Sequence, residues 1–505
     1  MRNIIAILIS FFFIPHLAAQ IHQPERFEVE LNYYDNYFNT ISAGKDGIAL
    51  VRESSERGKG NEGFYEVIML DSSLNELWRN SYGVPYDRFF RGYDYHKGSI
   101  ILLFTNKYSA SRDNMLLMKI DAATGEMEKF EIDLEFMVDL SHFEMVGESA
   151  IFAGYVNYRP TVFLYNLKDK RIIVLRGFYI ERSEIIQVDV DDDRDIFHVL
   201  ATMRTIDRRN TVMMKSFDKN GDLLINTILE PDEGYNLLYG RATTTNYGQQ
   251  FIAGVFSKTR SAKESRESYS LGIFIAKVDE WGEQTINYYN YADLDNFFNY
   301  MKASRQKKLK EKIERKKIKG KKIRFNYRLL VHDIIQKPDG SYIMVGEAYY
   351  PTSVTRSDFS YSYSYAYPNF LNSFKGFQYT HAVVVGFDSN GKLLWDNSFE
   401  INDVESIALE KFVKVDARPD SIILCYNYNN VIRTKIIEGD KVIEGKTFND
   451  IALKFSDEVA ERSNSMVGGL EEWYDNYFYA YGIQKIKKPD NKKRDVFFVN
   501  KIYYK

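Results

Sequence analysis

The dominant feature of this sequence is an internal repeat. Each unit ends in an apolar strand, a turn that opens with Asp or Asn, and a second strand, as in SFDKNGDLLI and GFDSNGKLLW. Apart from one gap that is twice as long, the turns recur about every 50 residues, a period that indicates repeated supersecondary units stacked on one another. The turns open at Asp71, Asp121, Asn166, Asp218, Asp279 and Asp388, with a seventh near Gly439.

Each unit also contains a second hairpin before this turn. It is clearest in HDIIQKPDGSYIMVGEAYY, where two alternating strands flank Pro338, Asp339 and Gly340. Proline fixes φ, Asp caps the backbone and Gly accepts a positive φ, so the three residues favour a tight turn. Four short antiparallel strands within each period are typical of a β-propeller blade.

Seven full units can be counted, and strands remain at both ends of the chain. The C-terminal remainder offers Leu470–Tyr474, Tyr477–Lys485 and Val496–Tyr504, and the N-terminal remainder offers Phe27–Tyr33. We expect these four strands to form an eighth blade, because closing the ring removes exposed sheet edges. A seven-bladed ring is the alternative. The full units are 33–82, 83–132, 133–175, 180–229, 233–291, 328–400 and 403–447.

Composition agrees with an all-β protein that has a large core. Of the 505 residues, 45% are apolar, 27% are charged and 15% are aromatic. The excess of Tyr and Phe favours strands over helices. The single cysteine, Cys425, lies in the apolar run SIILCYNY and is predicted to be a buried thiol. One cysteine cannot form an intrachain disulfide, so the fold must be stabilised by packing.

The segment 1–20 has the layout of a secretory signal peptide. It contains one basic residue, an apolar stretch from Ile4 to Ile14, and small residues at Ala18 and Ala19. An N-terminal membrane anchor is the alternative, but a spanning helix needs about 20 apolar residues. The pattern therefore predicts export with cleavage near Ala19 or Gln20, and no transmembrane segment in the mature chain.

Two repeats also carry a family resemblance. KIDAATGEMEK and GFDSNGKLLW combine Asp and Gly with an aromatic position four residues after the Gly, which Trp395 fills and Lys129 does not. This pattern resembles the repeat of the quinoprotein-like propellers. That family contains pyrroloquinoline quinone dehydrogenases and cofactor-free scaffolds of the bacterial envelope. The dehydrogenases carry a disulfide between adjacent cysteines at the cofactor, which Cys425 alone cannot make, so the resemblance implies the scaffold branch without a cofactor.

The first insertion, residues 292–327, is strongly basic. From Lys302 to Arg324 it carries thirteen Lys or Arg and two acids, a local charge of +11 in a chain whose net charge is −3. Good helix formers and the stop at Gly320 predict a helix from Asp293 to Lys319. Its apolar stripe is sparse, so we expect the helix to rest lightly on the ring. The stripe consists of Phe297, Phe298, Met301, Leu309 and Ile313.

This charge predicts an electrostatic contact with an acidic protein, anionic lipid headgroups or lipopolysaccharide phosphates. The alternative is a solvated insertion without a partner. Nucleic acid is disfavoured, because export removes the opportunity and no aromatic stacking motif accompanies the cations. The candidate partner-binding residues are Lys307, Lys308, Lys312, Arg315 and Lys316.

The second insertion, residues 351–380, is rich in Tyr and Ser. Tyr361, Tyr363, Tyr365 and Tyr367 alternate with small residues, so an extended segment places all four rings on one side. Tyr and Ser together favour binding, which predicts a protein or glycan contact. The alternative is a hairpin whose rings pack on the propeller rim.

Propeller topology predicts that both insertions emerge on one face of the ring. The shorter loops 54–63 and 257–268 should lie there too. Loops that vary on a rigid scaffold commonly carry function.

No catalytic motif accompanies this fold. The seven histidines never form the i, i+4 pair of a zinc protease, and the chain lacks a serine nucleophile elbow, a phosphate-binding loop and a cysteine knuckle. His198, in DIFHVLA, is predicted to be a core residue.

VDVDDDRD resembles the start of a calcium loop, but Arg194 and Leu200 stand where Gly and the bidentate acid belong, so a hairpin turn is the better interpretation. Paired carboxylates of a glycosidase have no sequence signature and stay open.

The sequence predicts an exported, non-enzymatic β-propeller that needs no metal or cofactor. It would act as a protein-interaction scaffold of the bacterial cell envelope, in the periplasm or at the cell surface, peripherally associated with an outer-membrane protein assembly. The alternative is a carbohydrate-binding protein or a glycan-active enzyme with its site at the central channel. The predicted divisions are a signal peptide at 1–20, one propeller domain at 21–505, and insertions at 292–327 and 351–380.

Overall fold

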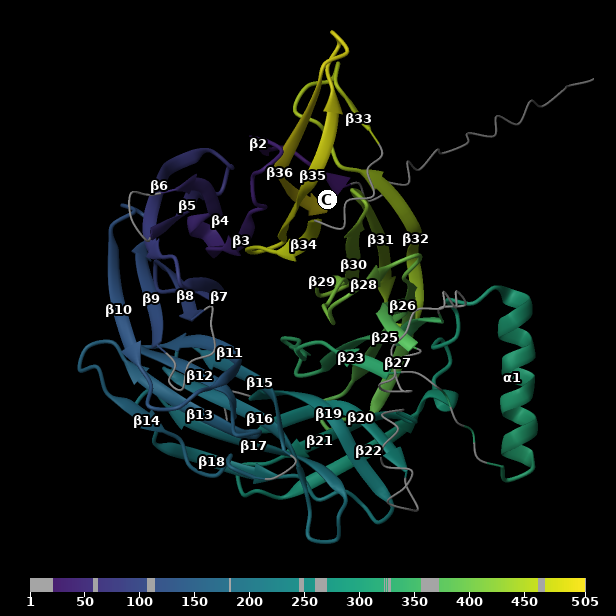
Figure 1. The fold of residues 1–505 in the computed structure, drawn as a ribbon. Helices are drawn as coiled ribbons and strands as arrows, with labels where there is room; N and C mark the ends of the chain where they lie inside the picture. The colour runs from purple at the N-terminus through teal and green to yellow at the C-terminus, as the bar shows by residue number, and fades with distance from the viewer. Residues whose placement is uncertain are drawn as a thin grey trace, which may run out of the picture.

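Eight β-sheets stand around a common axis, and one α-helix lies outside the ring (Figure 1). The predicted eight-bladed β-propeller is therefore confirmed, and each of the seven predicted full units corresponds to one blade. The computed structural model describes residues 21–57, 62–106, 114–180, 183–244, 249–258, 270–321, 323, 325, 328–355, 372–461 and 468–504.

The first four blades each contain four antiparallel strands in chain order from the axis outward. Blade 1 contains β3 (Asn39–Ser42), β4 (Ile48–Arg57), β5 (Glu62–Leu70) and β6 (Glu76–Pro85). Blade 2 contains β7 (Arg88–His96), β8 (Ser99–Asn106), β9 (Asn114–Asp121) and β10 (Met127–Asp133). Blade 3 contains β11 (Asp139–Val146), β12 (Ser149–Val156), β13 (Arg159–Asn166) and β14 (Ile172–Val174). Blade 4 contains β15 (Glu184–Asp191), β16 (Ile196–Arg204), β17 (Asn210–Asp218) and β18 (Leu223–Ile228).

The next three blades follow the same order, with small extra strands in blade 6. Blade 5 contains β19 (Tyr235–Thr244), β20 (Gln250–Lys258), β21 (Gly272–Val278) and β22 (Gln284–Asn290). Blade 6 contains β23 (Arg328–Val331), β24 (Ile335–Gln336), β25 (Tyr342–Thr355), β26 (Asn372–Phe387), β27 (Leu393–Glu400) and β28 (Glu405–Ser406). Blade 7 contains β29 (Lys414–Ala417), β30 (Ile422–Tyr428), β31 (Val431–Glu438) and β32 (Lys441–Asp450).

Blade 8 joins the two ends of the chain, as predicted. Its C-terminal strands are β33 (Val459–Glu461), β34 (Gly468–Glu472), β35 (Tyr477–Lys487) and β36 (Lys493–Tyr504). The N-terminal strands β1 (Ile21–His22) and β2 (Arg26–Leu31) both pair with β36 and complete the sheet. Two short 3-10 turns, η1 (Gly44–Asp46) and η3 (Tyr291–Asp293), and the helix α1 (Ala303–Ile318) complete the described elements.

The second and third strands of the blades are buried on both sides because neighbouring blades cover both faces of each sheet. In β8, for example, every side chain from Ser99 to Phe104 is buried. The cores therefore lie between blades, and Leu102 of blade 2 belongs to the same cluster as Val67 of blade 1. This explains why such strands appear in the sequence as continuous apolar runs. Burial of Cys425 (3% exposed) is also confirmed.

The Asp residues that open the repeat turns cap the turn backbone. The Asp218 carboxylate accepts hydrogen bonds from the amides of Asn220 (2.9 Å) and Asp222 (2.8 Å), while Gly221 adopts a positive φ of 86°. The Asp388 turn repeats this geometry with Asn390 and Lys392, both at 2.9 Å. The predicted structural role of these aspartates is confirmed.

Two tryptophans fasten one blade to the next. The Trp78 indole of blade 1 donates to the Ala122 carbonyl of blade 2 at 2.8 Å. The Trp473 indole of blade 8 donates to the Gly47 carbonyl of blade 1 at 3.0 Å. Trp78, which follows the repeat turn opened by Asp71, thus serves blade packing.

A buried ionic network seals the seam between the chain ends. Arg26 pairs with Glu28 at 2.6 Å, and Arg494 pairs with Glu28 at 2.7 Å and with Glu458 at 3.0 Å. The four side chains are 4 to 10% exposed. Breaking such a buried pair costs about 3–5 kcal/mol, because a lone charge remains in a desolvated site.

Candidate functional site

The first insertion begins with a folded segment and not with a helix, which corrects the prediction. Phe297 and Phe298 are 0% and 1% exposed in the core cluster shared by blades 5 and 6. The Asp396 carboxylate of β27 accepts hydrogen bonds from the amides of Asp295 (2.9 Å) and Asn296 (2.7 Å). Because these residues pack on the sheet edge, α1 starts only at Ala303.

Helix α1 touches the ring through very few side chains, as predicted. Ile313 is its only buried residue. Lys317 pairs with Asp293 at 2.9 Å, and the Lys310 ammonium donates to the Asp295 carbonyl at 3.0 Å. No helix in the described part of the chain is both long and apolar enough to cross a membrane.

The five predicted partner-binding residues of the first insertion all lie on α1. Lys307, Lys308, Lys312 and Arg315 are exposed, and Lys316 is half-buried. None of them forms an ion pair with a described carboxylate. Their positive charge is therefore available to an external partner.

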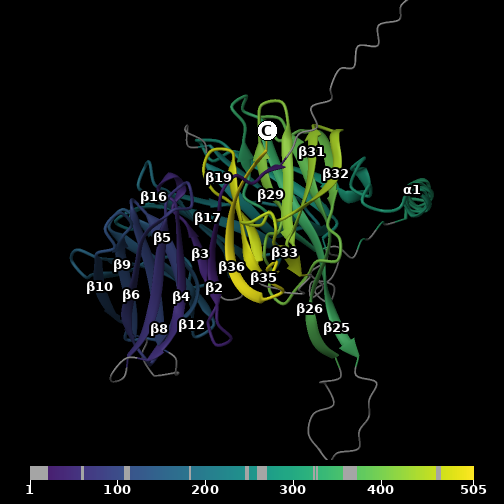
Figure 2. The ribbon, with the colours of Figure 1, turned by 90° about the horizontal axis from the view of Figure 1, so that it is seen from above.

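The second insertion extends the β25–β26 hairpin beyond the ring. The hairpin leaves the ring along its axis, whereas α1 lies beside the outer rim (Figure 2). The prediction that both insertions present one common binding face is therefore wrong, because the first insertion folds back along blade 6. The predicted residues Tyr361, Tyr363, Tyr365 and Tyr367 lie outside the described residues.

Exposed tyrosines gather on one face of the ring. We call it the link face: the face where the links between blades and the turns between second and third strands emerge. Of the eight largely exposed tyrosines among the described residues, only Tyr93 lies on an inner strand. The others lie in those links and turns or at the base of the β25–β26 hairpin. They are Tyr33, Tyr34, Tyr37, Tyr86, Tyr158, Tyr179 and Tyr350.

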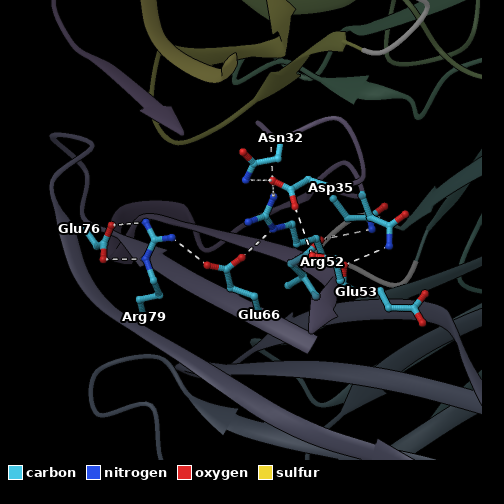
Figure 3. Close-up of polar contacts among 11 residues, drawn as sticks. Asn32, Asp35, Arg52, Glu53, Glu66, Glu76 and Arg79 are labelled. Atoms are coloured by element: carbon cyan, nitrogen blue, oxygen red, sulfur yellow. Dashed lines mark hydrogen bonds and ion pairs between the residues drawn. The ribbon is translucent and has the colours of Figure 1, made fainter. Parts of the chain in front are cut away.

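The most exposed neighbouring pair is Tyr33 and Tyr34, in the link from β2 to β3. The two side chains are 94% and 83% exposed, and their rings meet edge to face at 5.1 Å. The backbone around them is fixed, because Asp35 accepts hydrogen bonds from the amide (2.9 Å) and the side chain (3.2 Å) of Asn32 and pairs with Arg52 at 3.5 Å (Figure 3).

Arg52 in turn belongs to a chain of alternating charges across blade 1. It pairs with Glu66 at 2.6 Å, and Glu66 pairs with Arg79 at 2.8 Å (Figure 3). Arg79 also pairs with Glu76 at 2.8 Å. The Arg52 guanidinium lies 4.4 Å from the centre of the Phe38 ring, so it fixes both ends of the link. The exposed tyrosines therefore stand on a rigid support.

Tyr158 is presented in a different way. It occupies the turn between β12 and β13 with φ of 63°, next to Asn157 with φ of 50°, and is 97% exposed. A bulky side chain is uncommon in this left-handed region. The neighbouring Arg159 lies 4.5 Å over the Tyr179 ring and connects the turn to the next link.

A second candidate site lies on the inner strands of blades 2 to 4. Asp94, Glu144 and Asp189 occupy β7, β11 and β15. Burial, followed by repulsion from Asp94 and Asp189, raises the pKa of Glu144 to about 8. Desolvation by the surrounding blades and repulsion from Asp333 raise the pKa of Asp189 to about 6, and burial also raises the pKa of Asp94. The three acids therefore share an environment that favours their protonated forms.

The inner positions of blades 5 to 8 carry opposite charges in pairs. Lys411 pairs with Asp333 at 2.7 Å, and Arg241 approaches Asp333 at 3.7 Å. Although burial acts to raise it, the pKa of Asp333 is lowered by these cations. Lys414 pairs with Glu471 at 2.6 Å. The axis of the ring is thus acidic on one side and charge-balanced on the other.

Sequence reasoning missed these inner acids, although a signal was present. Asp94, Glu144 and Asp189 follow one another at intervals close to the period of the repeat. Residues at equivalent positions of successive blades meet at the axis. Comparing the first strand of every repeat would have identified the group.

The remaining chemical candidates have structural roles. His198 is buried and shares a 2.7 Å hydrogen bond with Ser216, and burial lowers its pKa to about 4, so the core prediction is confirmed. The acidic segment VDVDDDRD forms the β15–β16 hairpin turn, as predicted. No group of three or more His, Cys, Asp or Glu side chains placed to hold a metal ion occurs among the described residues.

Comparisons with known proteins show the fold alone. No family model matches this chain, and no curated protein matches it. Polysaccharide lyase Uly1 is similar with a TM-score of 0.41 and 8% identity over 94% of this chain and 100% of that chain. The β-propeller domain of the Trilobed protease from Pyrococcus furiosus has a TM-score of 0.36 and 7% identity over 81% of this chain and 97% of that chain. The chain is an eight-bladed β-propeller by its own sheets, and it has no family assignment, quinoprotein-like or other.

Proposed function

We propose that this protein is an exported, non-enzymatic interaction scaffold of the bacterial cell envelope, and that it holds an outer-membrane protein assembly on its link face. The observation that carries the proposal is the gathering of exposed tyrosines on that face, with Tyr33 and Tyr34 on a rigid support. Exposed aromatic rings do not contribute to the core, and Tyr is enriched where proteins bind one another.

The geometry of the Tyr33–Tyr34 link favours tight contact. The Asp35 hydrogen bonds and the Arg52 ion pair already order its backbone, so a partner meets a loop that loses little further entropy. A Tyr ring buries about 150–250 Å² on contact. Four such rings would supply roughly the 800 Å² per partner of a standard protein interface.

Export and envelope location rest on the N-terminal pattern of a basic residue, an apolar stretch and small residues. The scaffold assignment is also supported by the resemblance of the repeat to cofactor-free quinoprotein-like propellers. Attachment to the outer membrane would be peripheral, through a protein partner, in the periplasm or at the cell surface.

The test is native purification of the tagged protein from envelopes in mild detergent, followed by mass spectrometry and by titration of the purified partner. We expect Y33A/Y34A to weaken the partner's affinity at least about thirtyfold, because the loss of even one central Tyr costs about 2 kcal/mol. The matched variant Y33F/Y34F keeps both rings and should retain most of the affinity. A partner that binds the alanine variant as tightly as the unmodified protein would refute the link-face scaffold.

Deleting the whole first insertion would not test the role of α1 alone, because residues 292–327 include the buried Phe297 and Phe298. Replacing only α1, residues 303–318, by a short linker removes the helix and keeps Phe297 and Phe298, at the cost of Ile313 in the same core cluster.

A second candidate function is a carbohydrate-binding or glycan-active site at the ring axis. The raised pKa of Glu144, about 8, favours it, because a carboxyl that stays protonated near neutral pH can act as a general acid beside a second carboxylate. Incubating the protein with bacterial cell-wall oligosaccharides tests this function. Cleavage or binding that E144Q abolishes would support it, whereas no response from the unmodified protein would exclude it for those sugars.

A further inference from the structure

Helix α1, together with the residue that ends it, carries a continuous stripe of positive charge along one flank. Arg305, Lys308, Lys312, Arg315 and Lys319 follow one another at intervals of three or four residues, and all are exposed. This spacing places them side by side on the helix surface. Of the two acids of the helix, Glu314 lies on a different flank, and Glu311 borders the stripe, three residues after Lys308 and four before Arg315. We call these five residues the basic stripe.

The basic stripe does not stabilise the fold. Its members form no ion pair with any described carboxylate, and neighbouring like charges on a helix repel one another. By contrast, Lys310 and Lys317, on another side of α1, reach back to Asp295 and Asp293. One group of cations on α1 therefore holds the helix on the ring, and a different group faces the solvent.

We propose that the basic stripe docks on a surface of anionic lipid headgroups. A phosphate-bearing lipid layer is the occupant because α1 exposes dispersed cations and a single exposed large apolar side chain, Ile318, and each cation contributes independently near an anionic membrane. Protein interfaces instead have an apolar or aromatic centre and are depleted in Lys. None of the sixteen residues of α1 is aromatic, and its apolar Ile313 is turned to the ring.

The position of α1 suits this role. The helix lies outside the perimeter of the blades (Figures 1 and 2), so a flat surface can reach it without displacing the ring. Lys317 and Lys310 hold it to the link between blades 5 and 6, and Ile313 packs in the core cluster that these two blades share. Because the stripe and the link face are separate surfaces, this inference does not depend on the proposed scaffold function.

The experiment is sedimentation of the purified full chain with vesicles at low salt. One set contains phosphatidylglycerol in phosphatidylcholine, and the other contains phosphatidylcholine alone. The test variant is R305Q/K308Q/K312Q/R315Q, in which Gln keeps helix propensity. The matched control is K168Q/K170Q/R171Q/R176Q, which removes the same charge from exposed positions on blade 3. Thermal unfolding confirms that both variants are folded.

We expect the unmodified protein and the blade 3 control to bind the anionic vesicles only. The α1 variant should bind them at least about tenfold more weakly, and high salt should release the protein. Equal binding to both vesicle types, or equal binding by the α1 variant, would overturn the proposal. Displacement by millimolar soluble glycerol phosphate would indicate a discrete phosphate site, and stronger binding to soluble polyglutamate than to vesicles would indicate an acidic protein partner. Either result would also overturn it.

Discussion

At the seam between the chain ends, Arg26 and Arg494 lie buried and pair with Glu28 and Glu458, whereas the cations of the basic stripe on α1 are exposed and form no ion pair with a described carboxylate. Glu144 on the inner strand of blade 3 is a third case, because it is partly buried and no cation is among the causes of its raised pKa. The difference shows that charge serves the fold where desolvation makes a partner necessary. Where solvent screens charged side chains, they need no partner within the fold and are available to bind other molecules.

The largest effect is expected at the seam. Arg494→Ala should lower the free energy of unfolding by about 3–5 kcal/mol, because it leaves Glu28 and Glu458 buried without their partner. Urea-induced unfolding measures this change. The matched variant Arg315→Ala on α1 should change the free energy by less than about 0.5 kcal/mol. Similar losses of unfolding free energy in both variants would contradict the distinction between the buried seam and the exposed basic stripe.

The enclosed acids should give a pH-dependent effect. The pKa of Glu144 is about 8 in the folded protein and 4.5 ordinarily. Between these two pKa values the folded state holds a proton that the unfolded chain has lost. The stability that this bound proton contributes is therefore fully present below the ordinary pKa and is lost as pH rises through the folded pKa. Glu144→Gln cannot titrate. Its stability relative to the unmodified protein should therefore rise from about pH 5 to about pH 8 in thermal unfolding series. A stability difference between the two proteins that does not vary with pH would contradict the raised pKa of Glu144.

A smaller and more local effect is expected at Asp35. Asp35→Ala removes the hydrogen bonds from Asn32 and the Arg52 ion pair, so it should cost about 1–2 kcal/mol. Hydrogen exchange should accelerate at the amides of residues 32–38. Asp193→Ala, at an exposed turn position, is the control and should leave those rates unchanged. Slow exchange in the Asp35 variant would show that the support of Tyr33 and Tyr34 lies elsewhere.

The smallest effect on folding is expected from the basic stripe. Replacing Arg305, Lys308, Lys312 and Arg315 by Gln should leave the free energy of unfolding unchanged or raise it by a few tenths of a kcal/mol, because like-charge repulsion is relieved. Chemical denaturation measures this. A clear destabilisation would mean that the stripe has partners within the fold.

The fold could be predicted from the sequence because one signal was repeated many times. The Asp-opened turns gave the period, and the strands left over at the two ends gave the eighth blade, which β2 and β36 confirm. The start of α1 could not be predicted, since Phe297 and Phe298 suit a helix stripe as well as a packed link. Only the position of the Asp396 carboxylate, far away in the sequence, decides between these interpretations.

The candidate sites were predictable only in part. The cations of α1 are contiguous in the sequence, so composition revealed them. The link face is assembled from links and turns of several blades, and no single segment shows that Tyr33 and Tyr158 belong to the same side. The rigidity of the Tyr33–Tyr34 link depends on the partners that Arg52 finds on other strands, which local sequence does not specify.

The pairing of Ile21 with Tyr504 places both ends of the described chain at the same end of the β1–β2–β36 seam. A force pulling these ends apart would peel the seam one residue pair at a time, and would not shear all its hydrogen bonds together. Such a zipper opens at low force until the tension reaches the Arg26 network, the first buried ionic contact that it meets. The ring therefore has a built-in mechanical stop only a few residues inside the ends of the described chain.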